Sequence, residues 1–184
     1  MMKRSFRSRC MLRILVVALN CFYSTGHATN LNSEIARILE SELPNKPEFS
    51  WGAEEKKFLY HLYRLGNFDA LWANNTQREV LLHYIENANA DGLDANDYHL
   101  PQLKSLAESI RTQQPSSIAE YDILLTDAFV RLAYNLRFGK ANPQDLDSNW
   151  NFSRALITND PAAWLKGKIE SKTIIDSLTW LQPK

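Results

Sequence analysis

Apolar residues recur every three or four positions along most of the chain, which is the period of one face of an α-helix. The longest such stretch covers residues 116–138, and shorter ones cover residues 31–43, 54–65, 76–88, 101–110, 161–169 and 174–181. No segment sustains the alternation of apolar and polar residues that a half-buried strand requires. We therefore predict an all-α fold, a single irregular multi-helix domain with a long central helix over residues 116–138.

Polar, glycine and proline residues predict where several helices begin and end. Ser33 is the expected N-cap of the first helix, and residues 76–79 have the Thr-x-x-Glu pattern of a capping box. Gly66-Asn67 and Gly139 are expected to close helices in the manner of glycine C-caps. Pro101 fits the first turn of a helix, where its missing N–H costs nothing.

Residues 91–98 gather the Asp and Asn side chains that calcium loops use as ligands. The register does not fit an EF-hand, because a loop starting at Asp91 would have apolar residues at two ligand positions and its glycine at position two instead of six. We predict turn chemistry instead, with positive φ at Gly92 and a cap from Asp94 or Asn96.

The first 28 residues have the features of a secretory signal peptide. Five basic residues and no acidic one precede an apolar run over residues 14–23. The small residues Gly26 and Ala28 lie at the third and first positions before the expected cleavage point. The run is about half the roughly 20 residues that a transmembrane helix needs. We therefore predict a signal peptide over residues 1–28, a helical domain over residues 29–184, and no stable membrane span after cleavage.

Both cysteines, Cys10 and Cys21, fall inside the predicted signal peptide. Lipid attachment at Cys21 is disfavoured because Asn20, and not a small residue, precedes it. The mature chain would hold no thiol and no disulfide, so its stability would depend on apolar burial. Five of the 21 basic residues would also be removed, which leaves 16 against 21 acidic residues and a formal charge of −5. This acidic balance excludes nucleic acid as an expected partner.

Side chains that often carry chemistry are present without a diagnostic arrangement. His61, His83 and His99 lie on separate predicted elements without metal-ligand spacing, so we expect structural histidines and no metal or other cofactor. Trp72, Trp150 and Trp164 could stack on sugar rings, but we expect them to fill gaps between helices.

Two pairs of carboxylates could be imagined as the acid and nucleophile of a glycosidase, which flank a sugar bond. These are Glu79 with Glu86 and Asp122 with Asp127. Any acidic helical chain offers such spacings, and nucleophile-elbow and phosphate-binding motifs are missing. We therefore expect no catalytic residue in this chain.

Residues 124–140 read LLTDAFVRLAYNLRFGK and are followed by Asn142-Pro143 and Trp150. They are preceded, in order, by Tyr63-Arg64, Leu71-Trp72, Asp91-Gly92-Leu93 and Asp97-Tyr98. Together these pieces resemble the scaffold domain of large bacterial L,D-transpeptidases over roughly residues 58–181. The resemblance implies a periplasmic envelope protein of a Gram-negative bacterium, associated with peptidoglycan 3-3 cross-linking, in which a helical scaffold supports a cysteine transpeptidase domain.

The chain departs from that family in having no counterpart of the catalytic segment, a histidine followed by Ser/Thr-His-Gly-Cys, or of the peptidoglycan-binding domain. We therefore expect a non-enzyme, a truncated remnant or partner module, whose partners are peptidoglycan or cell-wall enzymes. The alternatives are a non-catalytic subunit of a split L,D-transpeptidase and a peptidoglycan glycan hydrolase. The oligomeric state is not predicted, although an exposed apolar patch is expected near Trp180 and Leu181.

Overall fold

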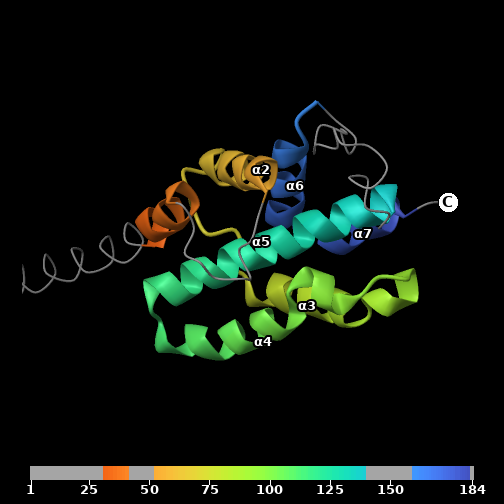
Figure 1. The fold of residues 1–184 in the computed structure, drawn as a ribbon, viewed down its shortest axis with the longest axis horizontal. Coiled ribbons are helices and arrows are strands. Elements are labelled where there is room, and N and C mark those ends of the chain that lie inside the picture. Colours follow the sequence, from red (N-terminus) through yellow and green to blue (C-terminus); the bar gives the residue numbers. More distant parts are fainter. Residues whose placement is uncertain (1–30, 42–51, 140–158, 183–184) are drawn as a thin grey trace, which may run out of the picture.

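Helix α5 (Pro115–Phe138) forms the axis of the molecule. The computed structural model describes residues 31–41, 52–139 and 159–182, and every regular element in these ranges is a helix. At 1.5 Å per residue, α5 is about 36 Å long. The other helices lie along both sides of it (Figure 1). The all-α class and the long central helix are therefore confirmed.

The remaining elements are a helix at residues 31–40, α2 (Ala53–Arg64), α3 (Asn75–Glu86), η2 (Ala88–Asp91), η3 (Ala95–Tyr98), α4 (Leu100–Ser109), η4 (Ile110–Thr112), α6 (Pro161–Glu170) and α7 (Ile174–Leu181). Helices α4 and α7 pack on α5, α2 packs on α6, and α3 packs on α7. Figure 1 shows α2 and α6 on one side of α5, and α3 and α4 on the other. The result is an irregular bundle and not a repeat of one helix pair.

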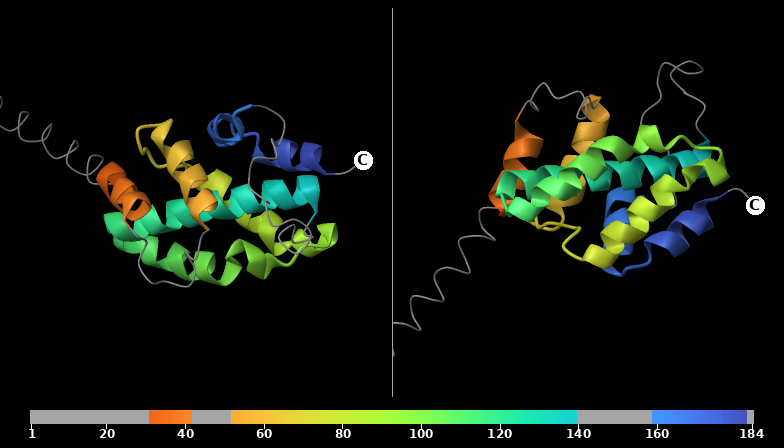
Figure 2. Two further views of the ribbon diagram at one scale, coloured as in Figure 1. Left: turned by 45° about the horizontal axis from the view of Figure 1, so that its top comes forward. Right: turned by 90° about the horizontal axis from the view of Figure 1, so that it is seen from below.

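The helix at residues 31–40 lies beside α2, near the start of α5 (Figure 2). Ile35, Ile38 and Leu39 are buried there in the common core. The Asn32 side chain donates a 2.6 Å hydrogen bond to Asp69 after α2. This first helix is therefore an integral part of the fold.

The centre of α5 is buried on every side. All ten positions from residue 121 to residue 130 are buried, including Asp122, Thr126 and Asp127. A helix surrounded in this way needs internal partners for its polar side chains, because an unpaired buried polar group is costly. The three buried polar residues at the centre of α5 therefore have partners on other segments instead of water.

The buried apolar residues form one cluster, whose largest fully buried members are Trp72, Tyr63, Tyr98 and Phe129. The Trp72 ring meets Phe129 edge to face, with ring centres 6.0 Å apart. Such aromatic pairs contribute about 0.5–1.5 kcal/mol beyond the area they bury. A single continuous core confirms the predicted single domain.

The start of α3 differs from the prediction. Asn74 is the N-cap, and its side-chain oxygen accepts a hydrogen bond from the Gln77 N–H. The capping box at residues 76–79 is wrong, because Asn74 is as strong a cap former and precedes Thr76 by two residues. The N-cap role of Ser33 is also wrong, since residues 31 and 32 are already helical.

Replacing Asn74 with alanine is expected to lower the free energy of unfolding by about 1 kcal/mol, because an orphan N–H of α3 loses its acceptor. The matched control is Thr76→Ala, which removes the cap that the sequence favoured. Since Thr76 is exposed and caps nothing, its loss is expected to stay within about 0.5 kcal/mol. Urea denaturation of both variants measures the difference, and equal losses would contradict the cap assignment.

Other predicted ends are confirmed. Gly139 closes α5 with a φ of 80°, and its N–H donates to the Asn135 carbonyl at 2.9 Å. Pro101 lies in the first turn of α4. Gly92 has a φ of 73°, and the Asp94 side chain accepts from the Asn96 N–H at the start of η3. The acidic segment is thus the predicted turn.

Gly66 does not act as the predicted C-cap. The left-handed residues after α2 are Asn67 and Phe68, with φ values of 52° and 60°. A Cβ atom on Gly66 would lie 2.7 Å from the Lys166 Cε atom of α6. This Cε atom belongs to the far end of a flexible side chain that can move, so the packing of α6 does not itself require glycine at position 66.

The C-terminal patch is partly as predicted. Trp180 is 55% exposed, whereas Leu181 is fully buried. Leu181 follows Ile174 and Leu178 on the inward face of α7, since these positions are three and seven residues apart. The expected patch is therefore correct for Trp180 and wrong for Leu181.

The predicted signal peptide lies outside the described residues, and so do Asn142-Pro143 and Trp150 of the scaffold-domain resemblance. Within the described ranges, no helix has both the length and the apolar character that a bilayer crossing demands.

Candidate functional site

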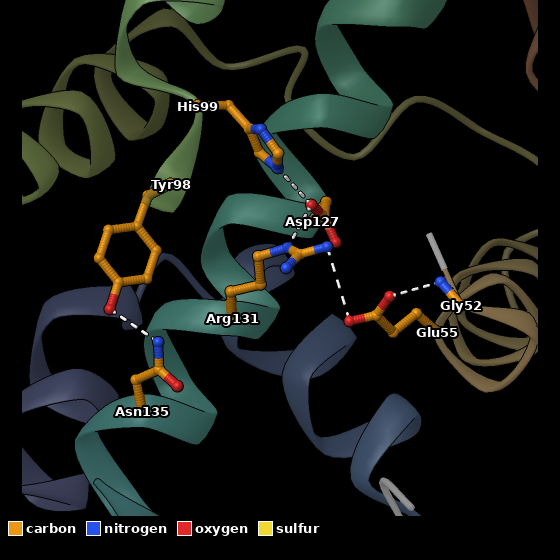
Figure 3. A network of polar contacts seen from close by, with 7 residues as sticks. All are labelled: Gly52, Glu55, Tyr98, His99, Asp127, Arg131 and Asn135. Atoms are coloured by element: carbon orange, nitrogen blue, oxygen red, sulfur yellow. Dashed lines mark hydrogen bonds and ion pairs between the residues drawn. The ribbon is translucent and has the colours of Figure 1, made fainter. Parts of the chain in front are cut away.

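A polar network on α5 is centred on Asp127, which is 2% exposed. The Asp127 Oδ2 atom lies 2.6 Å from the Nε2 atom of His99 and accepts a 2.7 Å hydrogen bond from the Nε atom of Arg131 (Figure 3). Asp127 and Arg131 are one turn apart, so the helix itself fixes their spacing. His99 comes from the junction of η3 and α4. The carboxylate thus joins two segments of the fold.

Arg131 extends this network to α2. Its Nη2 atom lies 3.6 Å from the Oε1 atom of Glu55, and the second oxygen of Glu55 accepts a 2.7 Å hydrogen bond from the Gly52 N–H (Figure 3). Glu55 therefore satisfies an orphan donor at the N-terminus of α2 and faces the guanidinium of α5. The network connects α5 to two other segments.

Burial opposes ionisation of Asp127, but the hydrogen bond with His99 and the charge of Arg131 outweigh it and lower the pKa of Asp127. Burial also disfavours the charged guanidinium, yet the adjacent carboxylate raises the pKa of Arg131. The two groups therefore form an ion pair at neutral pH. In the described part of the chain, no three His, Cys, Asp or Glu side chains are placed to share a metal ion.

One turn beyond Arg131, Asn135 donates a 2.9 Å hydrogen bond to the Tyr98 hydroxyl (Figure 3). Asn135 also borders a cavity of about 380 Å³ at the C-terminal end of α5, together with Asp91 and Gln182. This volume falls within the usual range of small-ligand pockets, about 300–1,000 Å³. Gln182 donates to Asp91 at 2.8 Å, so two of the three polar groups already bind each other.

A second network surrounds Asp122, which is 3% exposed. Its carboxylate accepts hydrogen bonds from the Tyr63 hydroxyl at 2.6 Å, the Leu71 N–H at 3.0 Å and the Trp72 N–H at 2.8 Å. The Trp72 indole N–H donates to Thr126 at 2.9 Å. Burial raises the pKa of Asp122 to about 6, although these hydrogen bonds oppose the rise. The network holds the segment after α2 against α5.

The three histidines remain on separate elements, as predicted. His61 lies with its Nε2 atom 3.7 Å from the Asp160 carboxylate, and His83 is exposed. Sequence reasoning missed the pairing of His99 with Asp127, because the two residues are 28 positions apart and neither lies in a recognisable motif.

The candidate carboxylate pairs do not assemble into one site. Glu79 and Glu86 are exposed on α3, where Glu86 forms an ion pair with Lys104. Asp122 and Asp127 are buried in the two different networks, each occupied by its own donors. Neither pair therefore offers two carboxyl groups to one substrate bond.

Trp72 fills a gap between helices, as predicted, and is 1% exposed. Trp164 is half-buried, and the Lys168 ammonium lies 5.3 Å from its ring centre, a cation–π contact. Trp150 lies outside the described residues. Trp72 and Trp164 thus have partners within the protein.

The fold and these networks define an irregular all-α domain in which buried polar side chains join helices. The sequence model of the Scaffold domain family matches residues 57–184, and the chain belongs to this family. The match confirms the scaffold-domain resemblance found in the sequence. No curated protein and no solved structure matches the chain. The helix at residues 31–40 precedes the matched region, although its apolar side chains share the core.

Proposed function

We propose that this protein is a non-catalytic, periplasmic helical scaffold that acts in peptidoglycan cross-linking as a partner of an L,D-transpeptidase. The observation that carries the proposal is the Scaffold domain match over residues 57–184. The buried networks support it, because Asp122 and Asp127 hold helices together instead of facing a substrate. The role assigned here is to present a stable surface to peptidoglycan or to a cell-wall enzyme.

The arrangement around His99 supports a non-catalytic role. Acyl transfer requires a nucleophilic thiol or hydroxyl within hydrogen-bond reach of a base. The His99 imidazole pairs with Asp127, and that same oxygen is bound by Arg131. Among the described side chains, no hydroxyl or thiol is hydrogen-bonded to this imidazole. This arrangement favours a structural role for the pair, with Asp127 as the shared acceptor.

The proposal is tested in the source bacterium and with purified protein. We expect the protein in the periplasmic fraction with Thr29 as its N-terminus, and we expect affinity purification from envelope extracts to recover a cysteine transpeptidase or peptidoglycan. Deleting the gene is expected to lower the share of 3-3 cross-linked muropeptides, measured by chromatography and mass spectrometry.

Purified protein incubated alone with sacculi is expected neither to release nor to cross-link muropeptides. Release of glycan fragments would replace the proposal with the hydrolase alternative. Recovery of the protein from the cytoplasm, or unchanged muropeptides together with no cell-wall partner, would overturn the proposed role.

A further inference from the structure

A groove of about 510 Å³ follows α2 and reaches the helix at residues 31–40, and none of its lining residues belongs to either polar network. Leu39 of the first helix, Ala53 at the start of α2, and Tyr60 in its middle supply the apolar part of its lining. Two adjacent helices with an apolar depression between them are the usual receptor for the apolar face of a third helix.

The remaining lining residues are all basic or histidine, namely Lys56, Lys57, His61 and Arg64. Lys57 is paired with Glu54 at 2.6 Å, and His61 lies 3.7 Å from a carboxylate of Asp160. These two groups therefore contribute little net charge to a ligand.

Lys56 and Arg64 carry the charge that is not compensated. Lys56 donates to the Ser41 carbonyl, a neutral group, at 2.6 Å. Arg64 is exposed, and no side chain of the described residues forms an ion pair with it. The two cations are eight residues apart on α2, so they lie about 12 Å apart along its axis. Tyr60 lies midway between them, which gives the groove a basic–apolar–basic order.

We propose that this groove docks an acidic amphipathic helix of a partner protein. A carboxylate on such a helix would meet Lys56, a large apolar side chain one turn later would meet Tyr60, and a second carboxylate after another turn would meet Arg64. Charge complementarity selects this occupant, because Lys56 and Arg64 have no ion-pair partner among the described side chains and none of the lining residues is acidic. One carboxylate, that of Glu40, lies beside the groove and accepts a 3.5 Å hydrogen bond from the Tyr60 hydroxyl. The inference rests on α2 and its neighbour and not on the peptidoglycan assignment.

The test uses the mature full-length chain and a fluorescent helical peptide with leucine flanked by glutamate four residues before and after it. We expect saturable binding by fluorescence anisotropy that weakens at high salt. The double variant Lys56→Gln/Arg64→Gln is expected to bind about fivefold more weakly, since two exposed ion pairs are lost. An otherwise identical peptide with lysine in place of each glutamate is expected to show no saturable binding.

The matched control is Lys104→Gln/Arg111→Gln on the other side of the molecule, which removes the same charge from exposed residues that pair with Glu86 and Glu108. It is expected to bind like the unmodified protein, and circular dichroism verifies that both double variants are folded. The proposal is overturned if the groove variant binds the glutamate peptide as tightly as the unmodified protein does. It is also overturned if the unmodified protein binds the lysine peptide equally well. Absence of binding by the unmodified protein also overturns it.

Discussion

Replacing Asp122 with alanine is expected to lower the free energy of unfolding by about 3 kcal/mol at pH 7, because buried donors left without an acceptor cost about 1–3 kcal/mol each. The donors are the Tyr63 hydroxyl and the N–H groups of Leu71 and Trp72. Urea denaturation followed by circular dichroism measures the loss. Asp176→Ala is the control, since this exposed aspartate on α7 is expected to contribute less than about 1 kcal/mol.

The raised pKa of Asp122 leads to a second prediction, which concerns the pH dependence of the free energy of unfolding. This pKa is about 6 in the folded protein and about 3.9 in an unfolded chain, so between these values the folded state holds a proton that the unfolded state has lost. The contribution of Asp122 to the free energy of unfolding is therefore fully present below about pH 4. It declines by up to about 3 kcal/mol as the pH rises through 6.

Asp122→Asn cannot titrate, so its stability relative to the unmodified protein is expected to improve between pH 4 and pH 7. Denaturation at several pH values provides the comparison. Parallel stability curves for the two proteins would show that Asp122 has an ordinary pKa and that the carboxylate is better solvated than its burial indicates.

Replacing Asp127 with alanine is the other change with a large expected effect, also about 3 kcal/mol, because removing one member of a buried ion pair leaves its partner uncompensated. Arg131 is 28% exposed, which places the effect at the lower end of the usual range of about 3–5 kcal/mol. His99 loses the same acceptor. Thermal and urea denaturation at pH 7 measure the change.

Glu55→Gln is the matched control for Asp127. The amide retains an oxygen for the Gly52 N–H and removes only the charge that faces Arg131 from 3.6 Å. A contact of this length between partly exposed groups is expected to contribute less than about 1 kcal/mol. A larger loss in the Glu55 variant than in the Asp127 variant would mean that Glu55, and not Asp127, neutralises Arg131.

The pH dependence of the Asp127 contribution has the opposite sign to that of Asp122. Its folded pKa lies below the unfolded value, so its stabilisation is present above about pH 4 and is lost as the pH falls through the lowered pKa. The Asp127→Asn protein is therefore expected to lose less stability than the unmodified protein on acidification below pH 4.

The positions of the helices followed from local features of the sequence. The spacing of apolar residues located every α-helix of the described ranges, and Gly139, Pro101 and Asp94 marked ends that the structure confirms. These signals are readable because helical hydrogen bonds and caps join residues only a few positions apart. The scaffold-domain resemblance was readable for a related reason, since it rests on short pieces in a fixed order.

Tertiary structure decided which polar residues became structural centres. Tyr63 meets Asp122 across 59 positions, and His99 meets Asp127 across 28, while the periodic pattern marked α5 only as a helix with one wide apolar face. Local spacing fixes which side chains share a face of one helix, but only the packing of neighbouring helices determines which of those side chains lose water and must bind each other.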